Sequence, residues 1–87
     1  MKHARKDYDR IQDPAGLIPE DEPVFLLRAK DEVAPLTVER WADLAEQAGA
    51  DWSMLKVARE HAQKMRAWQR KHGSYVPDMP TRAKEGL

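Results

Sequence analysis

The feature that most constrains the fold is a three-residue break, residues 49–51, between two stretches with helical periodicity. The first predicted helix covers residues 35–48. Its Pro35 suits a first helical turn, and Gly49 suits the left-handed residue that follows a helix end. The second predicted helix covers residues 52–72. Because consecutive helices joined by so short a connection fold back antiparallel, the sequence predicts a mainly α protein built on a helical hairpin.

The ends of the second helix carry their own signals. Asp51 is a favourable N-cap residue. Gly73 suits the position after the last helical residue, and the basic last turn that precedes it complements the helix dipole. These signals support the predicted bounds of the second helix independently of its periodicity.

Each predicted helix has a wide apolar face. At about 100° per residue, the apolar positions of the second helix and those of the first each span about 160° of the helical wheel. The alanines on these faces would let the helices approach closely, and the larger side chains would fill the core. The larger side chains expected there are Trp41, Trp68, Met54, Met65 and Leu55.

The densest apolar run of the chain, residues 24–27, reads Val24-Phe25-Leu26-Leu27. Its length favours a strand over a helix, and a strand needs a partner for its backbone. Within the chain the candidate partners are residues 8–11 and residues 75–76. We therefore expect an extended segment over residues 23–30 that is packed on the hairpin as part of the core. The alternative is an edge strand that pairs with a second copy in a homodimer.

The remaining segments have simpler predictions. Asp13-Pro14-Ala15-Gly16 fits a type I turn, and the acidic stretch between Pro19 and Pro23 is expected to run extended. Residues 1–10 are predicted to be a disordered basic arm and residues 74–87 a flexible tail. Residues 11–73 would then form a single small domain between disordered termini.

The composition excludes several classes of function. The chain has 87 residues, enough for one domain, and no cysteine, so disulfides, thiolate metal sites and cysteine nucleophiles are absent. Ser53 and Ser74 lack a histidine relay, and no glycine-rich phosphate fingerprint occurs. His61 and Met65 share a helix face but are read as packed side chains. We expect no enzyme activity, no catalytic residue, no metal and no cofactor.

Localisation is predicted from the same composition. No apolar run is long enough to span a membrane, and the basic N-terminus lacks the apolar stretch of a secretory signal. A cytoplasmic protein without membrane contact is therefore expected.

A net charge of zero hides a strong segregation of charge. Residues 52–72 carry six Lys or Arg and one Glu, whereas residues 36–51 carry four Asp or Glu and one Arg. The second helix thus has a basic outer face and the first an acidic one. Glu39 and Asp43 are like charges four residues apart, which suggests that the acidic face meets positive charge, although a solvated face is the commoner explanation.

The basic face is the sharpest candidate for a binding surface. A row of cations on one helix can follow nucleic-acid phosphates, and a tryptophan off the apolar face is a candidate interface residue. The candidate binding residues are Lys56, Arg59, Lys64, Arg66, Arg70 and Trp52. Because nucleic-acid-binding domains are usually basic overall and this chain is neutral, a solvated face or a protein partner is favoured over nucleic acid, which stays as the alternative.

One resemblance adds to this interpretation. The Asp13-Pro14-Ala15-Gly16 turn, followed by the string DEPVFLLRAKD at residues 21–31, resembles a family of small, uncharacterised bacterial proteins. The resemblance implies a bacterial cytosolic protein and transfers no catalytic residue. The sequence as a whole predicts a small, non-catalytic protein-interaction module that could be homodimeric through residues 24–27. The alternative is a nucleic-acid-binding protein that uses the basic face of the second helix.

Overall fold

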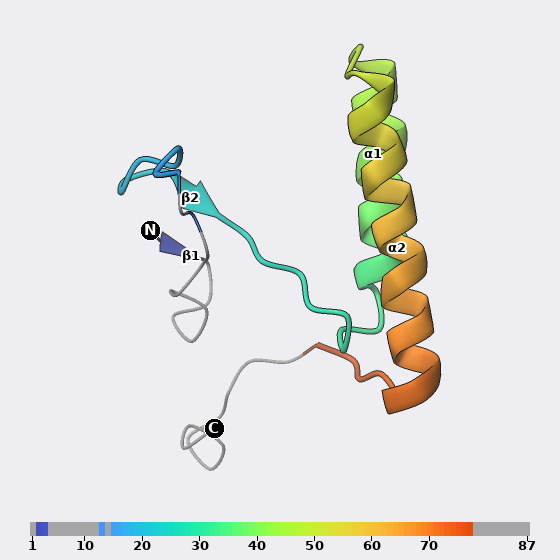
Figure 1. Cartoon of the computed structure of the whole chain (residues 1–87). Coiled ribbons are helices and arrows are strands. Elements are labelled where there is room, and N and C mark those ends of the chain that lie inside the picture. Colours follow the sequence, from blue (N-terminus) through green and yellow to red (C-terminus); the bar gives the residue numbers. More distant parts are fainter. Residues whose placement is uncertain (1, 4–12, 14, 78–87) are drawn as a thin grey trace.

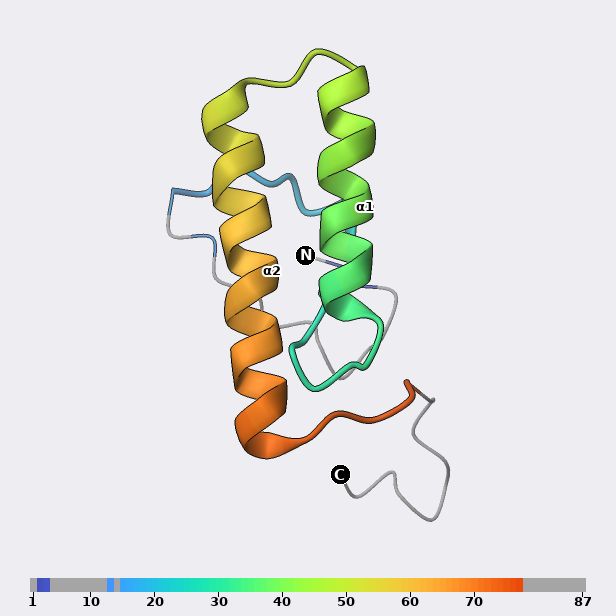
Figure 2. The same ribbon diagram turned by 90° about the vertical axis from the view of Figure 1, so that its right-hand side faces the viewer.

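Two antiparallel helices dominate the fold (Figure 1 and Figure 2). A computed structural model of the chain describes residues 2–3, 13 and 15–77. Helix α1 covers Ala34–Gln47 and helix α2 covers Trp52–His72. They pack against each other along α1, so the predicted mainly α helical hairpin is confirmed. Helix α2 has the predicted bounds, and α1 lies one residue earlier than predicted at each end.

The ends of α1 follow local chemistry. The helix begins at Ala34, and Pro35 occupies its first turn as predicted. The backbone carbonyl of Asp31 accepts a hydrogen bond from the Ala34 N–H at 3.0 Å. After the helix, Gly49 has a φ of +90°, and its N–H donates to the carbonyl of Glu46 at 3.0 Å. A left-handed glycine therefore reverses the chain toward α2.

The ends of α2 also lie where the sequence places them. Asp51 is the N-cap residue with an extended backbone, but its carboxylate accepts a hydrogen bond from the Ser53 hydroxyl instead of a backbone N–H. Gly73 follows the last residue with a φ of +85°, and its N–H donates to the Gln69 carbonyl at 2.7 Å. Both helix bounds of α2 are thus set by residues that local signals identify.

The core between the helices is built from small side chains. Ala42 of α1 and Ala62 of α2 are fully buried, and the central cluster joins Ala42 to Leu55 and Ala58. Met65 is also buried, as expected. The expectation for three larger side chains is wrong, because they are 40–48% exposed: Trp41, Met54 and Trp68. A single neighbouring helix covers only part of a 160° apolar arc, so the rest of each arc faces outward.

The extended segment forms a short strand pair. Strand β2, Pro23–Val24, pairs in parallel with strand β1, Lys2–His3, in the register Lys2 to Pro23 and His3 to Val24. Of the two predicted partners, residues 8–11 lie outside the described residues, and Tyr75 pairs with Asp31 instead. Lys2–His3 therefore forms a strand where the sequence predicted a disordered arm. The sequence could not predict this strand, because two residues are too few to show a periodic pattern. The rest of residues 1–10 lies outside the described residues.

The segment before β2 contains two turns. The N–H of Gly16 donates to the Asp13 carbonyl at 3.0 Å, which is the hydrogen bond of the predicted turn. The expectation of an extended stretch after Pro19 is wrong, because the Glu22 N–H donates back to the Pro19 carbonyl at 3.1 Å. The restriction that a proline imposes applies only to the residue before it. Residues 20–21 are therefore able to take turn conformations.

Residues 29–32 are held at the base of the hairpin. The side-chain amide of Gln69 in α2 donates to the Ala29 carbonyl at 2.9 Å and to the Asp31 carbonyl at 3.0 Å. The extended segment therefore joins the hairpin at its C-terminal end, while β2 lies apart from both helices (Figure 1). Gln69 lies within the apolar arc of α2, and the sequence interpretation did not predict that its amide binds these backbone carbonyls.

The chain after α2 closes the other side of the same loop. The Tyr75 N–H donates to the Lys30 carbonyl at 2.8 Å, and the Tyr75 carbonyl accepts from the Glu32 N–H at 2.9 Å. The Lys30 ammonium lies 5.7 Å from the centre of the Tyr75 ring. The start of the predicted flexible tail is therefore hydrogen-bonded, and residues 78–87 lie outside the described residues.

Candidate functional site

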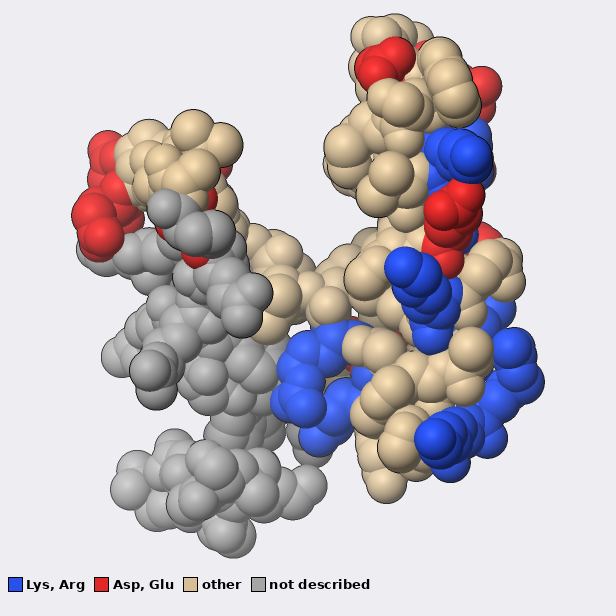
Figure 3. Space-filling view, viewed as in Figure 1, with Lys and Arg blue, Asp and Glu red and all other residues tan. Residues whose placement is uncertain are grey.

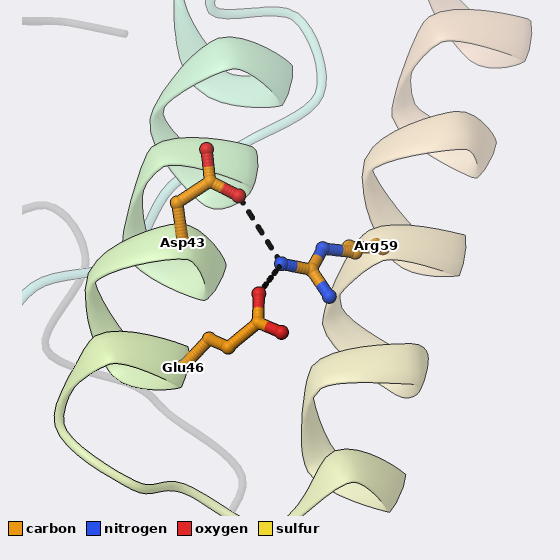
Figure 4. Close-up of polar contacts among 3 residues, drawn as sticks. All are labelled: Asp43, Glu46 and Arg59. Atoms are coloured by element: carbon orange, nitrogen blue, oxygen red, sulfur yellow. Dashed lines mark hydrogen bonds and ion pairs between the residues drawn. The ribbon is translucent and has the colours of Figure 1, made fainter.

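The charged faces of the two helices meet each other. Arg59 of α2 lies between two carboxylates of α1, with its Nη2 atom 3.1 Å from Asp43 Oδ1 and 2.9 Å from Glu46 Oε1 (Figure 4). Arg66 forms a bidentate ion pair with Glu39, in which the Arg66 Nη2 atom is 2.6 Å from Glu39 Oε1. We call this flank of the hairpin, defined by Glu39, Asp43, Glu46, Arg59 and Arg66, the ion-paired side.

These contacts favour the charged forms of Glu39, Arg59 and Arg66. Hydrogen bonds from Arg66 lower the pKa of the Glu39 carboxyl, against the opposing effect of its partial burial. Glu39 in turn raises the pKa of Arg66, and Glu46 followed by Asp43 raises the pKa of Arg59. The positive charge that the acidic face was expected to meet is thus supplied by α2 of the same chain.

Fewer cations of the candidate basic face are therefore available to bind a partner. Arg59 and Arg66 are occupied by α1, and Lys56 lies 3.9 Å from Glu60 one turn along the same helix. Among the residues that the structure describes, Lys64 and Arg70 have no ion-pair partner. The predicted residues therefore do not form a continuous row of available cations.

Trp52 lies at the N-terminal end of the ion-paired side. Its side chain is exposed and lines an open depression together with Glu46, Leu55 and Gln63. The structure therefore places Trp52 beside Arg59, which lines the same depression, and away from the core. This position agrees with its expected place off the apolar face.

The opposite flank of the hairpin is apolar. On the helical wheel the outer parts of both apolar arcs lie on the flank away from the paired carboxylates and arginines, and the antiparallel packing places them on one common side. We call it the apolar side; its large residues, 40–58% exposed, are Trp41, Leu44, Met54, Val57 and Trp68. Figure 3 shows Lys and Arg together with Asp and Glu along the edge of the hairpin that faces away from β2; on the edge that faces β2, the stretch between an acidic patch at the tip and a basic patch lower down is uncharged.

Two histidines share the apolar side but form no metal site. The ring of His72 stacks on Trp68 with the ring centres 4.4 Å apart. His61 lies on the same flank of α2, eleven residues earlier, about 16 Å along the helix. Within residues 15–77 and the other described positions, no three His, Asp or Glu side chains are grouped so that they could hold a metal ion.

The candidate self-association segment has one strand partner inside the chain. Strand β1 pairs with β2 at Val24, which is half-buried like Leu27. Phe25 and Leu26 are 67% and 38% exposed. Val24 therefore has a strand partner within the chain, but β2 does not join the hairpin core as expected, and a homodimer through residues 24–27 stays a prediction.

Comparisons with known proteins add no relative. No family model, no curated protein and no solved structure matches this chain. Neither helix of the described chain has the length and apolar character that crossing a membrane requires.

The apolar side is the site that sequence reasoning missed, although a signal for it is present. An apolar arc of about 160° on each helix is wider than the strip that one helical neighbour covers. Such an arc on both members of a two-helix hairpin indicates a further neighbour. The sequence interpretation instead assigned this arc to the hairpin core with residues 23–30 packed on it, but strand β2 of that segment lies apart from both helices.

Proposed function

We propose that the chain is a non-catalytic protein-interaction module and that the apolar side of its hairpin is the binding surface. The observation that carries this proposal is the exposure of five large apolar side chains on one flank of two packed helices. Contiguous exposed apolar surface on a small protein is typical of an interaction site. Burial of that surface by a further helix would complete a helical bundle.

The residue types on the apolar side support a protein partner. Tryptophan is the residue most enriched among those that dominate interface energies, and Trp41 and Trp68 both lie on this side. Met54 adds an unbranched side chain that adapts its shape to a partner. The helices beneath these residues are held by a buried alanine core, so the surface is presented on a rigid support.

Nucleic-acid binding through α2 is the weaker alternative. Two of its five candidate cations are bound to α1 carboxylates, and a third lies beside Glu60. Binding to phosphates would have to break those pairs or depend on Lys64 and Arg70. The cytoplasm stays the proposed compartment on the evidence of the composition.

The proposed binding surface is tested with the double substitution Leu44→Glu and Val57→Glu. Both side chains are exposed, so helicity measured by circular dichroism should stay the same. The native chain should either bind the apolar dye ANS, if the apolar side is open, or have twice the monomer mass by light scattering, if a second copy covers it. The double variant should lose whichever of these two properties the native chain has.

The control is Ala67→Glu, which adds one of the two negative charges of the double variant at an exposed position on the outer face of α2. It should leave both dye binding and mass unchanged. A monomeric native chain that binds no dye would contradict the proposal, because its apolar side would then be covered by the chain itself.

A further inference from the structure

The partner of the apolar side can be specified further from the charges at its borders. The next wheel positions outward from Leu44 and Val57 belong to Arg40 on α1 and to Lys64 and Lys71 on α2. None of these three cations has an ion-pair partner within the described part of the chain. The borders of the apolar side are therefore cationic.

The carboxylates of the helices lie elsewhere. Glu39, Asp43 and Glu46 are on the ion-paired side and already bind arginines. Glu60, on the outer face of α2, lies 3.9 Å from Lys56. An apolar strip with cationic borders is thus produced by a chain whose net charge is zero.

We propose that the occupant of the apolar side is an amphipathic helix of another protein whose polar face is acidic. This inference rests on the proposed function and names the chemistry of the partner. The apolar face of such a helix would pack between Trp41 and Trp68, and its flanking carboxylates would reach Arg40 and Lys64. A second copy of this chain is disfavoured, because it would bring the same cations against each other.

The length of the partner follows from the hairpin. Helix α2 has 21 residues, which corresponds to about 31 Å at 1.5 Å per residue. Helix α1 has 14 residues, and exposed apolar side chains of both helices line the surface. A partner helix of about four to five turns would cover the apolar side along α1 and α2.

The experiment uses the full chain with Trp52→Phe, so that its tryptophan fluorescence reports only on Trp41 and Trp68. The probes are two synthetic amphipathic peptides of about 18 residues with the same Leu and Ala face, one with Glu and one with Lys on the polar face. The Glu peptide should shift the emission to the blue and bind about tenfold more tightly, the scale of three exposed ion pairs. The preference should shrink as salt is added.

Charge reversal separates this inference from the proposed function. The double variant Arg40→Glu and Lys64→Glu should come to prefer the Lys peptide, whereas Lys56→Glu, off the apolar side, should keep the original preference. Equal binding of both peptides would overturn the acidic partner but leave the interaction surface standing. A native dimer that binds neither peptide would also overturn the acidic partner and leave the interaction surface standing, because a second copy would then occupy the apolar side. Failure of both peptides with a monomer that binds no ANS would overturn both proposals.

Discussion

The ion-paired side and the apolar side of the hairpin are built from the same two helices, but their side chains differ in whether they have partners within the chain. On the ion-paired side every carboxylate of α1 has an arginine of α2 within hydrogen-bond distance. Figure 4 shows the two carboxylates that share Arg59. On the apolar side large side chains such as Trp41 and Leu44 face solvent. Among the described residues, the first side is completed within the chain, and the second leaves large apolar side chains exposed. We propose that a partner covers the second side.

The largest expected difference in stability is between truncating a leucine in the core and truncating a leucine on the apolar side. Leu55 is 4% exposed and Leu44 is 50% exposed. Leu55→Ala should lower the free energy of unfolding by about 2–3 kcal/mol, because it leaves a cavity beside Ala42 and Ala58. Leu44→Ala should lower it by less than about 0.5 kcal/mol. Urea unfolding followed by circular dichroism measures both, and similar losses would show that Leu44 is buried in solution.

A second prediction concerns the close approach of the helices. Ala62 is fully buried between α1 and α2, whereas Ala67 is exposed on the same helix. Ala62→Leu should cost about 1–3 kcal/mol, because the larger side chain forces the helices apart. Ala67→Leu should change stability by less than about 0.5 kcal/mol. If both variants unfold at the same urea concentration, the alanine core is not as tightly packed as the structure shows.

A third prediction uses pH to address the ion-paired side. The pKa of Glu39 is lowered by its hydrogen bonds with Arg66, so the folded chain holds this proton less tightly than the unfolded chain, where the pKa is about 4.3. The contribution of the pair is complete above the unfolded pKa and is lost as the pH falls through the lower folded pKa. Thermal melts from pH 7 down to pH 2 should show this loss, and Glu39→Gln should flatten that part of the profile.

The matched control for the acid effect is Glu60→Gln, because Glu60 is an exposed carboxylate in the looser pair with Lys56. Its acid profile should follow that of the native chain. Added salt should reduce the difference between the native chain and Glu39→Gln at pH 7, since the pair is partly exposed. An unchanged acid profile in Glu39→Gln would show that the pair contributes nothing in solution.

A small effect on stability is also expected when a tryptophan of the apolar side is removed. Trp68→Ala should leave the free energy of unfolding of the isolated chain within about 0.5–1 kcal/mol of the native value, since the ring is 40% exposed and stacks on His72. The same variant should weaken binding of the acidic helical peptide at least tenfold if Trp68 is a central contact. A large loss of stability with unchanged binding would reverse the assignment of the two sides.

Local sequence signals predicted the helices well. The bounds of α2 were identified from Asp51, Gly73 and the apolar periodicity, and the turn at Gly49 has the predicted left-handed backbone. Each of these features depends on residues within one or two turns of each other. Periodicity and end signals are local, so they can be read without knowing what the helices pack against.

Contacts between residues that are distant in the sequence could not be predicted from local signals. Strand β1 joins Lys2–His3 to Pro23–Val24, and Gln69 binds the carbonyls of Ala29 and Asp31. A two-residue strand and a lone glutamine leave no periodic pattern. Their partners depend on where the chain returns in space, which local propensity does not determine.

The sequence by itself determined two amphipathic helices, their antiparallel connection and the sign of the charge that each helix carries. Only the tertiary structure decided how each helix is rotated about its axis within its wide apolar arc. That rotation buries Leu55 and Met65, leaves Trp41 and Trp68 exposed, and brings Arg66 onto Glu39. The physical reason is that a broad apolar arc tolerates several rotations. The choice among them is made by the close fit of alanines and by ion pairs across the helices.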